Sequence, residues 1–140
     1  MLIKIFTGII QLILDHRIIG ARAAQHVGVT LCADAKDEID EVTAEEAYRS
    51  AKLTGLAILS SLKQELGSLD RITAWLRVFG MVNTAPGFNQ QPSVINGFSD
   101  LILEIYGPER GKHARSAVGM AGLPMNIPVE IEAEVEIGGI

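Results

Sequence analysis

The residues best suited to chemistry in this sequence are one arginine and a row of glutamates. Arg115 lies between Ala114 and Ser116 at the head of an apolar stretch. Further along, apolar residues alternate with Glu130, Glu132, Glu134 and Glu136. An arginine among small neighbours fits either a surface ion pair or a site that grips a ligand. A row of glutamates at every second position is most simply the solvated face of a strand, so the residue types alone leave both interpretations open.

Other familiar catalytic and ligand-binding motifs are absent from the sequence. It contains no glycine-rich phosphate loop and no Gly-x-Ser-x-Gly nucleophile motif. The three histidines, His16, His26 and His113, lack the spacing of metal ligands, and the single Cys32 excludes an intrachain disulfide and a multi-cysteine metal site. We therefore expect neither a metal nor an organic cofactor. One free cysteine also indicates a reducing compartment, most simply the cytoplasm.

Length and charge limit the class of protein. A chain of 140 residues that is 48% hydrophobic is long and apolar enough for one domain with a substantial core. Its net charge of −5, without clustered lysine and arginine, argues against a nucleic-acid-binding surface. We therefore expect no nucleic-acid partner.

The first 31 residues open with the apolar run MLIKIFTGIIQLIL. This run is shorter than the roughly 20 residues needed to span a bilayer, so we expect no membrane-spanning segment. A secretory signal peptide is one interpretation, because Ala21-Arg22-Ala23 loosely resembles a cleavage site. Asp15, His16 and Arg17 interrupt the approach to that site, and we prefer an apolar strand or short helix that packs on the domain.

A helix is predicted from Thr43 to about Leu66. The sequence Thr43-Ala44-Glu45-Glu46 is a capping box at its start, and Gly67 suits a left-handed cap at its end. Apolar and small residues recur at helical spacing and are assigned to the core: Tyr48, Ala51, Gly55, Ile58, Leu59, Leu62 and Leu66.

The segment Arg71–Asn83 is predicted to be a strand that is largely apolar on both faces. Strict alternation would give one face with Ile72, Ala74, Leu76, Val78 and Val82. It would give the other face Thr73, Trp75, Arg77, Phe79 and Met81. Helices would cover the first face, and a partner subunit is the natural cover for the second.

A second helix and two strands are predicted to complete the domain. Pro92 suits a first turn and Gly107-Pro108 ends the helix, whose inward residues would be Ile95, Phe98, Leu101, Ile102 and Ile105. The two final strands are separated by Leu123-Pro124 and Pro128. The order helix, strand, helix, strand, strand predicts an α+β domain with two helices on one face of a sheet.

From about Thr43 to Ile137 the chain resembles the Rid family, also called YjgF-like. The resemblance rests mainly on Ala114-Arg115-Ser116, Leu123-Pro124 and the segment 129–133, with further likeness in SLDRI (68–72), VNTAPGF (82–88) and VINGFSD (94–100). It implies a chorismate-mutase-like (ferredoxin-like) fold assembled as a homotrimer, with residues 43–140 as the family core of the single domain. Rid proteins begin with a hairpin that carries a Ser-Gly-Gln type turn. Residues 1–42 contain no such motif, so we treat them as a divergent segment for which a hairpin is one candidate structure.

The resemblance also implies roles for five residues. Arg115 would bind the substrate carboxylate in a cleft between subunits, because the guanidinium fork matches a carboxylate with two parallel hydrogen bonds. Glu130 would position or activate a water molecule. Ala117, Phe88 and Asn96 would lie near the substrate, and Ala117 stands where the best-known members have cysteine.

The activity that the resemblance implies is that of an enamine or imine deaminase. Such an enzyme hydrolyses small 2-imino acids, of the 2-iminobutanoate and 2-iminopropanoate type, to 2-keto acids and ammonia without a metal or cofactor. Two alternatives stay open. One is a non-catalytic trimer that binds small carboxylates. The other is the endoribonuclease or translation-inhibitor activity attached to the family's names, which the acidic composition disfavours.

Overall fold

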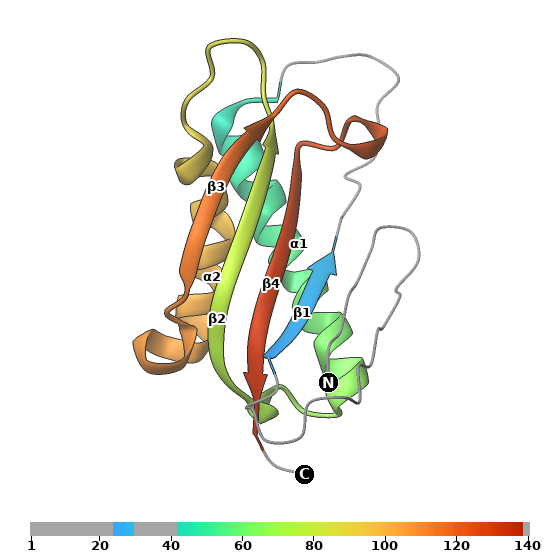
Figure 1. The fold of residues 1–140 in the computed structure, drawn as a ribbon, viewed down its shortest axis with the longest axis vertical. Coiled ribbons are helices and arrows are strands. Elements are labelled where there is room, and N and C mark those ends of the chain that lie inside the picture. The colour runs from blue at the N-terminus through green and yellow to red at the C-terminus, as the bar shows by residue number, and fades with distance from the viewer. Residues whose placement is uncertain (1–23, 30–41, 139–140) are drawn as a thin grey trace.

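The computed structural model describes residues 24–29 and 42–138, which form one four-stranded sheet with two helices on one of its faces (Figure 1). The elements, in chain order, are β1 (Ala24–Val29), α1 (Ala44–Leu66), β2 (Ile72–Asn83), α2 (Gln91–Gly111), β3 (Ala114–Met120) and β4 (Val129–Ile137). Short 3₁₀ turns occupy Leu69–Arg71 and Pro124–Asn126. The predicted α+β class and the order of elements after residue 43 are confirmed.

The strand order across the sheet is β1-β4-β2-β3. β4 runs antiparallel to both β1 and β2, whereas β2 and β3 are parallel. A parallel pair requires a crossover connection, and α2 supplies it, so this helix lies along the sheet edge formed by β3 (Figure 1). Pairing of β1 with β4 shows that the N-terminal segment contributes a strand. The apolar run, the hairpin hypothesis and Cys32 lie outside the described residues.

The predicted boundaries of α1 are confirmed at both ends. The Thr43 hydroxyl accepts a hydrogen bond from the Glu46 amide at 3.2 Å, and the Glu46 carboxylate accepts one from the Thr43 amide at 2.9 Å. Gly67 adopts a positive φ of 76°, and its amide donates to the carbonyl of Lys63 at 2.9 Å. Most of the predicted stripe is buried under the sheet, although Tyr48 lies at its margin.

Replacing Thr43 with alanine is expected to lower the free energy of unfolding by about 1 kcal/mol, because it leaves the first turn of α1 without its side-chain acceptor. The melting temperature should fall by roughly 3–5 °C for a domain of this size. Thr43→Ser keeps the hydroxyl and should restore most of the loss. Calorimetry on the three proteins checks this, and equal melting temperatures would mean that the box does not stabilise the helix.

Strand β2 departs from the predicted alternation. Its register with β4 shifts between Ile72 and Ala74 and again between Trp75 and Arg77, as expected for β-bulges. Trp75 is therefore 1% exposed, on the helix side of the sheet, whereas Leu76 is 38% exposed. Our assignment of these two residues to faces was wrong. Beyond the bulges the alternation is regular, with Val78 and Val82 in the main core.

The regular helical geometry of α2 breaks at Gly107, where the sequence predicted the end of the helix, although the element extends to Gly111. Gly107 has a positive φ of 69° and interrupts the helical geometry, so residues after it form a separate turn. Val94, Ile95, Phe98, Leu101 and Ile102 are buried. Ile105 is 48% exposed and does not face inward, because Tyr106 occupies the core-facing position in that turn. Neither helix in the described residues is long and apolar enough to cross a membrane.

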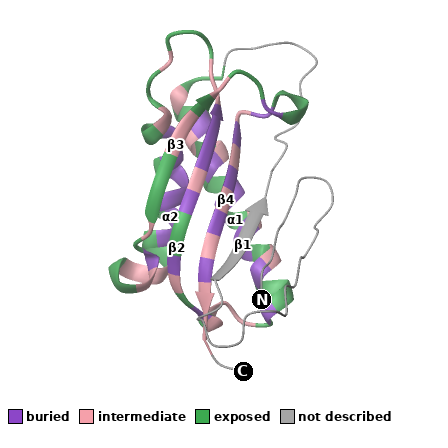
Figure 2. Ribbon diagram, viewed as in Figure 1, coloured by how far each residue is buried: buried purple, intermediate pink, exposed green. Residues whose placement is uncertain are grey.

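The two faces of the sheet differ in how they are covered (Figure 2). On the helix side, β4 buries Val129, Ile131, Ala133 and Val135, and its glutamates lie half-buried on the outer side, so the predicted half-buried strand is confirmed. A second, smaller cluster lies on the outer side and consists of Met81, Leu123 and Ile127 with Phe79, Val118 and Met120 packed around them. The connection between β3 and β4 therefore covers part of the face that we had assigned wholly to a partner subunit.

Candidate functional site

Arg115 occupies the edge strand β3 and turns its side chain toward α2. It is paired in register with Val78 of β2, which faces the helices, so Arg115 lies on the same side of the sheet. Its Nη1 atom donates to Oδ1 of Asn96 at 2.8 Å and to Oγ of Ser99 at 3.1 Å. The structure thus brings together two of the five predicted site residues, Arg115 and Asn96.

The contacts of Arg115 continue into the protein through two further side chains. Oγ of Ser99 lies 3.0 Å from Nε2 of His113, and Nδ1 of His113 lies 2.7 Å from the carbonyl oxygen of Gly111. Burial lowers the pKa of His113 below its usual value, and the nearby charge of Arg115 lowers it further, although the hydrogen bond to Gly111 opposes this. The imidazole is therefore neutral at pH 7.

A shallow groove of about 610 Å³ runs beside this cluster, between α2 and the start of β3. Its lining is mixed in character. Arg115, Lys112 and Asp100 contribute charge, Leu76 and Leu103 contribute exposed apolar surface, and Asn96, Ser99 and His113 contribute hydrogen-bonding groups. A small anion with an apolar side chain would find complementary groups in such a groove.

Glu130 lies on the other side of the sheet from Arg115. It is paired in register with Met81, which belongs to the outer cluster, and its neighbours Val129 and Ile131 face the helices. Partial burial raises the pKa of Glu130, and the adjacent Glu132 raises it further. A carboxyl group with a raised pKa exchanges protons more readily near neutral pH. Within this chain, however, it does not face the Arg115 groove.

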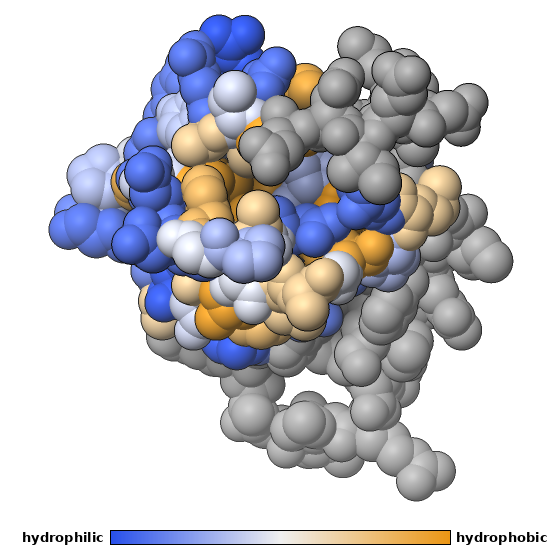
Figure 3. Space-filling view, turned by 90° about the horizontal axis from the view of Figure 1, so that it is seen from above, coloured by the Kyte–Doolittle hydropathy of each residue, from blue (hydrophilic) through white to orange (hydrophobic). Residues whose placement is uncertain are grey.

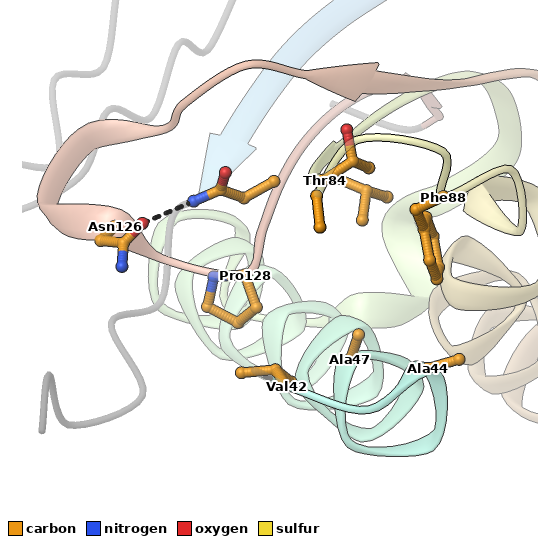
Figure 4. A pocket seen from close by; sticks show the side chains of 10 residues that line it. Val42, Ala44, Ala47, Thr84, Phe88, Asn126 and Pro128 are labelled. Carbon is orange, nitrogen blue, oxygen red and sulfur yellow. Dashed lines mark hydrogen bonds between the residues drawn. The ribbon is translucent and has the colours of Figure 1, made fainter. Parts of the chain in front are cut away.

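The remaining two predicted residues lie in different surroundings. Ala117 is partly buried and packs against the main core on the helix side of β3. Phe88 lines a separate cavity of about 340 Å³ between the start of α1, the end of β2 and the turn before β4 (Figure 4). The end view of the molecule shows apolar residues gathered around the middle of this region (Figure 3). Asn83 and Asn126 provide polar groups at this cavity, and Nδ2 of Asn83 donates a hydrogen bond to Oδ1 of Asn126 at 2.9 Å.

Ser99 and His113 are members of the site that sequence reasoning missed. The spacing of His113 was informative only about metal binding, and Ser99 lies in a helix whose dominant pattern is its apolar stripe. A signal was present, because Asn96 and Ser99 are three residues apart on one helical face, and His113, directly before β3, is two residues from Arg115 in that strand. Among the described residues, no group of three or more histidine, cysteine, aspartate or glutamate side chains could hold a metal ion.

Comparison with known proteins places this chain in a family. Residues 29–133 match the family described as "YjgF/chorismate_mutase-like, putative endoribonuclease". Protein TCP17 of Trypanosoma cruzi is 42% identical to this chain over 96 residues, which is 69% of this chain and 60% of that protein.

Two solved structures are similar to this chain in both sequence and fold. The protein Atu1372 with unknown function from Agrobacterium tumefaciens is 45% identical, with a TM-score of 0.66 over 69% of this chain and 61% of that one. A "putative endoribonuclease" from Shewanella oneidensis is 30% identical, with a TM-score of 0.66 over 71% of this chain and 65% of that one. This chain thus spans 60% to 65% of the length of the three relatives.

Proposed function

Because this chain belongs to the YjgF/chorismate mutase-like family, which includes the Rid proteins, we propose that it binds small 2-imino acids through Arg115 and hydrolyses them to 2-keto acids and ammonia. The observation that carries the proposal is the state of the Arg115 guanidinium. Both protons of Nη1 are directed at acceptors on α2, Asn96 and Ser99. Nε–H and the Nη2 protons make no hydrogen bond to any described residue, and Arg115 is exposed beside the groove.

Such an arginine is well prepared to bind a carboxylate. The side-on pair of donors, Nε–H and Nη2–H, has the geometry for two parallel hydrogen bonds to the two oxygens of one carboxylate. Fixation by α2 means that less side-chain entropy is lost on binding than for a free surface arginine. The exposed Leu76 and Leu103 would then lie within reach of an aliphatic substituent of the ligand.

The proposed reaction requires only water. Water adds through its oxygen to C2 of the imine and gives a tetrahedral carbinolamine. The C2–N bond then breaks, nitrogen leaves as ammonia with the protons taken from water, and C2 becomes the keto carbon. A carboxyl group that takes a proton from the attacking water and returns it to nitrogen would serve both steps. Glu130, with its raised pKa, is our candidate for this role.

Arg115 and Glu130 lie on opposite sides of the sheet, so they could serve the same site only across a boundary between two protomers. We therefore propose a homotrimer in which the groove of one protomer meets the outer sheet face of the next. Light scattering should give a mass near 45 kDa, three times the 15.1 kDa of the chain, as expected for a closed cyclic assembly. A stable species of about 15 kDa at micromolar concentration would contradict both the trimer and the shared site.

The activity is tested by following ammonia release from an imine that an amino-acid oxidase generates in the cuvette. The protein should accelerate loss of the imine, and Glu130→Gln should abolish this while leaving 2-keto acid binding intact. Glu65→Gln, which alters an exposed carboxylate at the end of α1, is the matched control. If the protein binds 2-keto acids and the imine decays at its spontaneous rate, turnover is excluded and only the binding function remains.

One observation favours the alternative of a non-catalytic carboxylate-binding protein. Arg115 and the α2 residues that hold it belong to one protomer, whereas Glu130 would have to come from another. Binding therefore requires only the folded protomer, and turnover also requires the assembly. The endoribonuclease named in the family description has weaker support, because the net charge of −5 opposes association with a polyanion. Salt-dependent RNA binding would be the evidence for it.

A further inference from the structure

We propose that His113 is a positioning residue for Arg115, and that it acts through the hydroxyl group of Ser99. Resting on the proposed carboxylate-binding function, this inference assigns a role to two residues that do not touch the ligand themselves. The feature that carries it is a continuous chain of hydrogen bonds from the carbonyl of Gly111 to the guanidinium of Arg115, in which each donor and acceptor is determined.

The direction of the chain follows from the chemistry of its two ends. The carbonyl oxygen of Gly111 can only accept, so Nδ1 of His113, at 2.7 Å, carries the imidazole proton. Because the ring is neutral, Nε2 carries no proton and must accept from the hydroxyl of Ser99 at 3.0 Å. The lone pairs of the Ser99 oxygen are then directed away from the histidine, and one of them accepts from Nη1 of Arg115 at 3.1 Å.

The consequence is a fixed orientation for the charged group. A serine hydroxyl alone rotates freely and can present either its proton or a lone pair to a neighbour. Binding to Nε2 removes that freedom, so Ser99 can act toward Arg115 only as an acceptor. Together with Asn96, which accepts from the same nitrogen at 2.8 Å, it holds Nη1 against α2. Nε and Nη2 are then left for a ligand in the groove that Arg115 lines.

The position of His113 supports this assignment over a role in packing alone. Its ring stands edge-on to Phe98, with centroids 6.3 Å apart, so the apolar part of the imidazole is held by the core while both nitrogens are bonded. Ser99 is 8% exposed and is one of two buried polar or charged side chains in the part of the chain that the structure describes. A buried hydroxyl needs a hydrogen-bonding partner, and this one has an acceptor in His113 and a donor in Arg115.

Nitrogen-15 NMR tests the chain without any ligand. His113 should show a protonated Nδ1 and an unprotonated Nε2 at pH 7, and Nη1 and Nη2 of Arg115 should give separate resonances because rotation of the guanidinium is hindered. In Ser99→Ala and in His113→Phe, which keeps an aromatic ring beside Phe98, the two Arg115 resonances should merge or exchange faster. A proton on Nε2 of His113, or unchanged Arg115 resonances in both variants, would overturn the proposal.

Calorimetric titration with pyruvate tests the consequence for binding. Ser99→Ala and His113→Phe should each weaken binding roughly three- to tenfold, the range for one neutral hydrogen bond, because Asn96 still holds Nη1. The double variant should be no weaker than either single one, since both changes remove the same link. Ser99→Thr keeps the hydroxyl and should restore affinity, and Ser93→Ala, on the exposed start of α2, is the control.

The two measurements separate the possible failures. If the parent protein binds no 2-keto acid, the proposed function fails, and the NMR experiment still decides whether His113 orients Arg115. If the parent binds and the variants bind equally well with lower melting temperatures, then Ser99 and His113 only join β3 to α2 and the inference is wrong.

Discussion

Replacing Arg115 with alanine is expected to weaken the binding of 2-keto acids by about 1.5–3 kcal/mol, or roughly ten- to a hundredfold, the range for a hydrogen-bonded charged group. Arg115→Lys should recover only part of this loss, because an ammonium group cannot present two parallel donors to one carboxylate. Titration with pyruvate and 2-oxobutanoate measures both effects. Arg49→Ala, which removes an exposed arginine on α1, should bind like the parent protein.

The fold should tolerate the loss of Arg115. Its side chain is exposed and contributes two hydrogen bonds to α2, so the free energy of unfolding should fall by no more than about 1 kcal/mol. Thermal melts of the same samples check this. An alanine variant that binds the keto acids as tightly as the parent, or one that fails to fold, would show that Arg115 is a structural link between strand and helix.

Replacing Trp75 with alanine is expected to lower the free energy of unfolding by about 3–5 kcal/mol, as for a large aromatic side chain removed from a core. The indole packs edge-on against Phe98 and Tyr106, with ring centroids 5.7 Å and 5.8 Å away, and is 1% exposed. Leu76→Ala, at the adjacent residue, should cost less than about 1 kcal/mol because that side chain is already 38% exposed. Denaturant unfolding of the two variants gives the comparison.

A second substitution isolates the cause of the loss at Trp75. The indole N–H is buried without a hydrogen-bond partner among the described residues, and this lowers the net contribution of the tryptophan. Trp75→Phe removes that donor and keeps an aromatic ring, so it should destabilise far less than alanine. A larger loss of unfolding free energy for Leu76→Ala than for Trp75→Ala would contradict the bulges. It would mean that β2 alternates regularly, as the sequence pattern indicated.

Local signals in the sequence correctly predicted much of the fold. The capping box at Thr43, the left-handed Gly67 and the break at Gly107 each depend on a few adjacent residues, and the structure confirms all three. The alternation in β4 was equally clear, because a strand with one buried face repeats every second residue. The motif around Arg115 also indicated the family, which the comparison confirms.

The sequence could not determine which face of β2 each residue occupies. Bulges arise where β2 pairs with β4, about sixty residues away along the chain, and no residue type in the segment marks them. The shift exchanged Trp75 and Leu76 between the core and the outer surface. Short-range periodicity describes a strand only while its pairing is regular, so it assigns residues beyond a bulge to the wrong face.

The sequence by itself supplied the candidates for the carboxylate anchor and the proton-transfer group, and the tertiary structure decided how they are placed. Arg115 and Glu130 belong to one motif, yet the register across β2 directs them to opposite sides of the sheet. His113 and Ser99 are fourteen residues apart and meet only because α2 crosses from β2 to the parallel edge strand β3. The chemistry of each side chain is set by its own residue type. Which face it lies on and which residues surround it depend on the pairing of strands that are distant in the sequence.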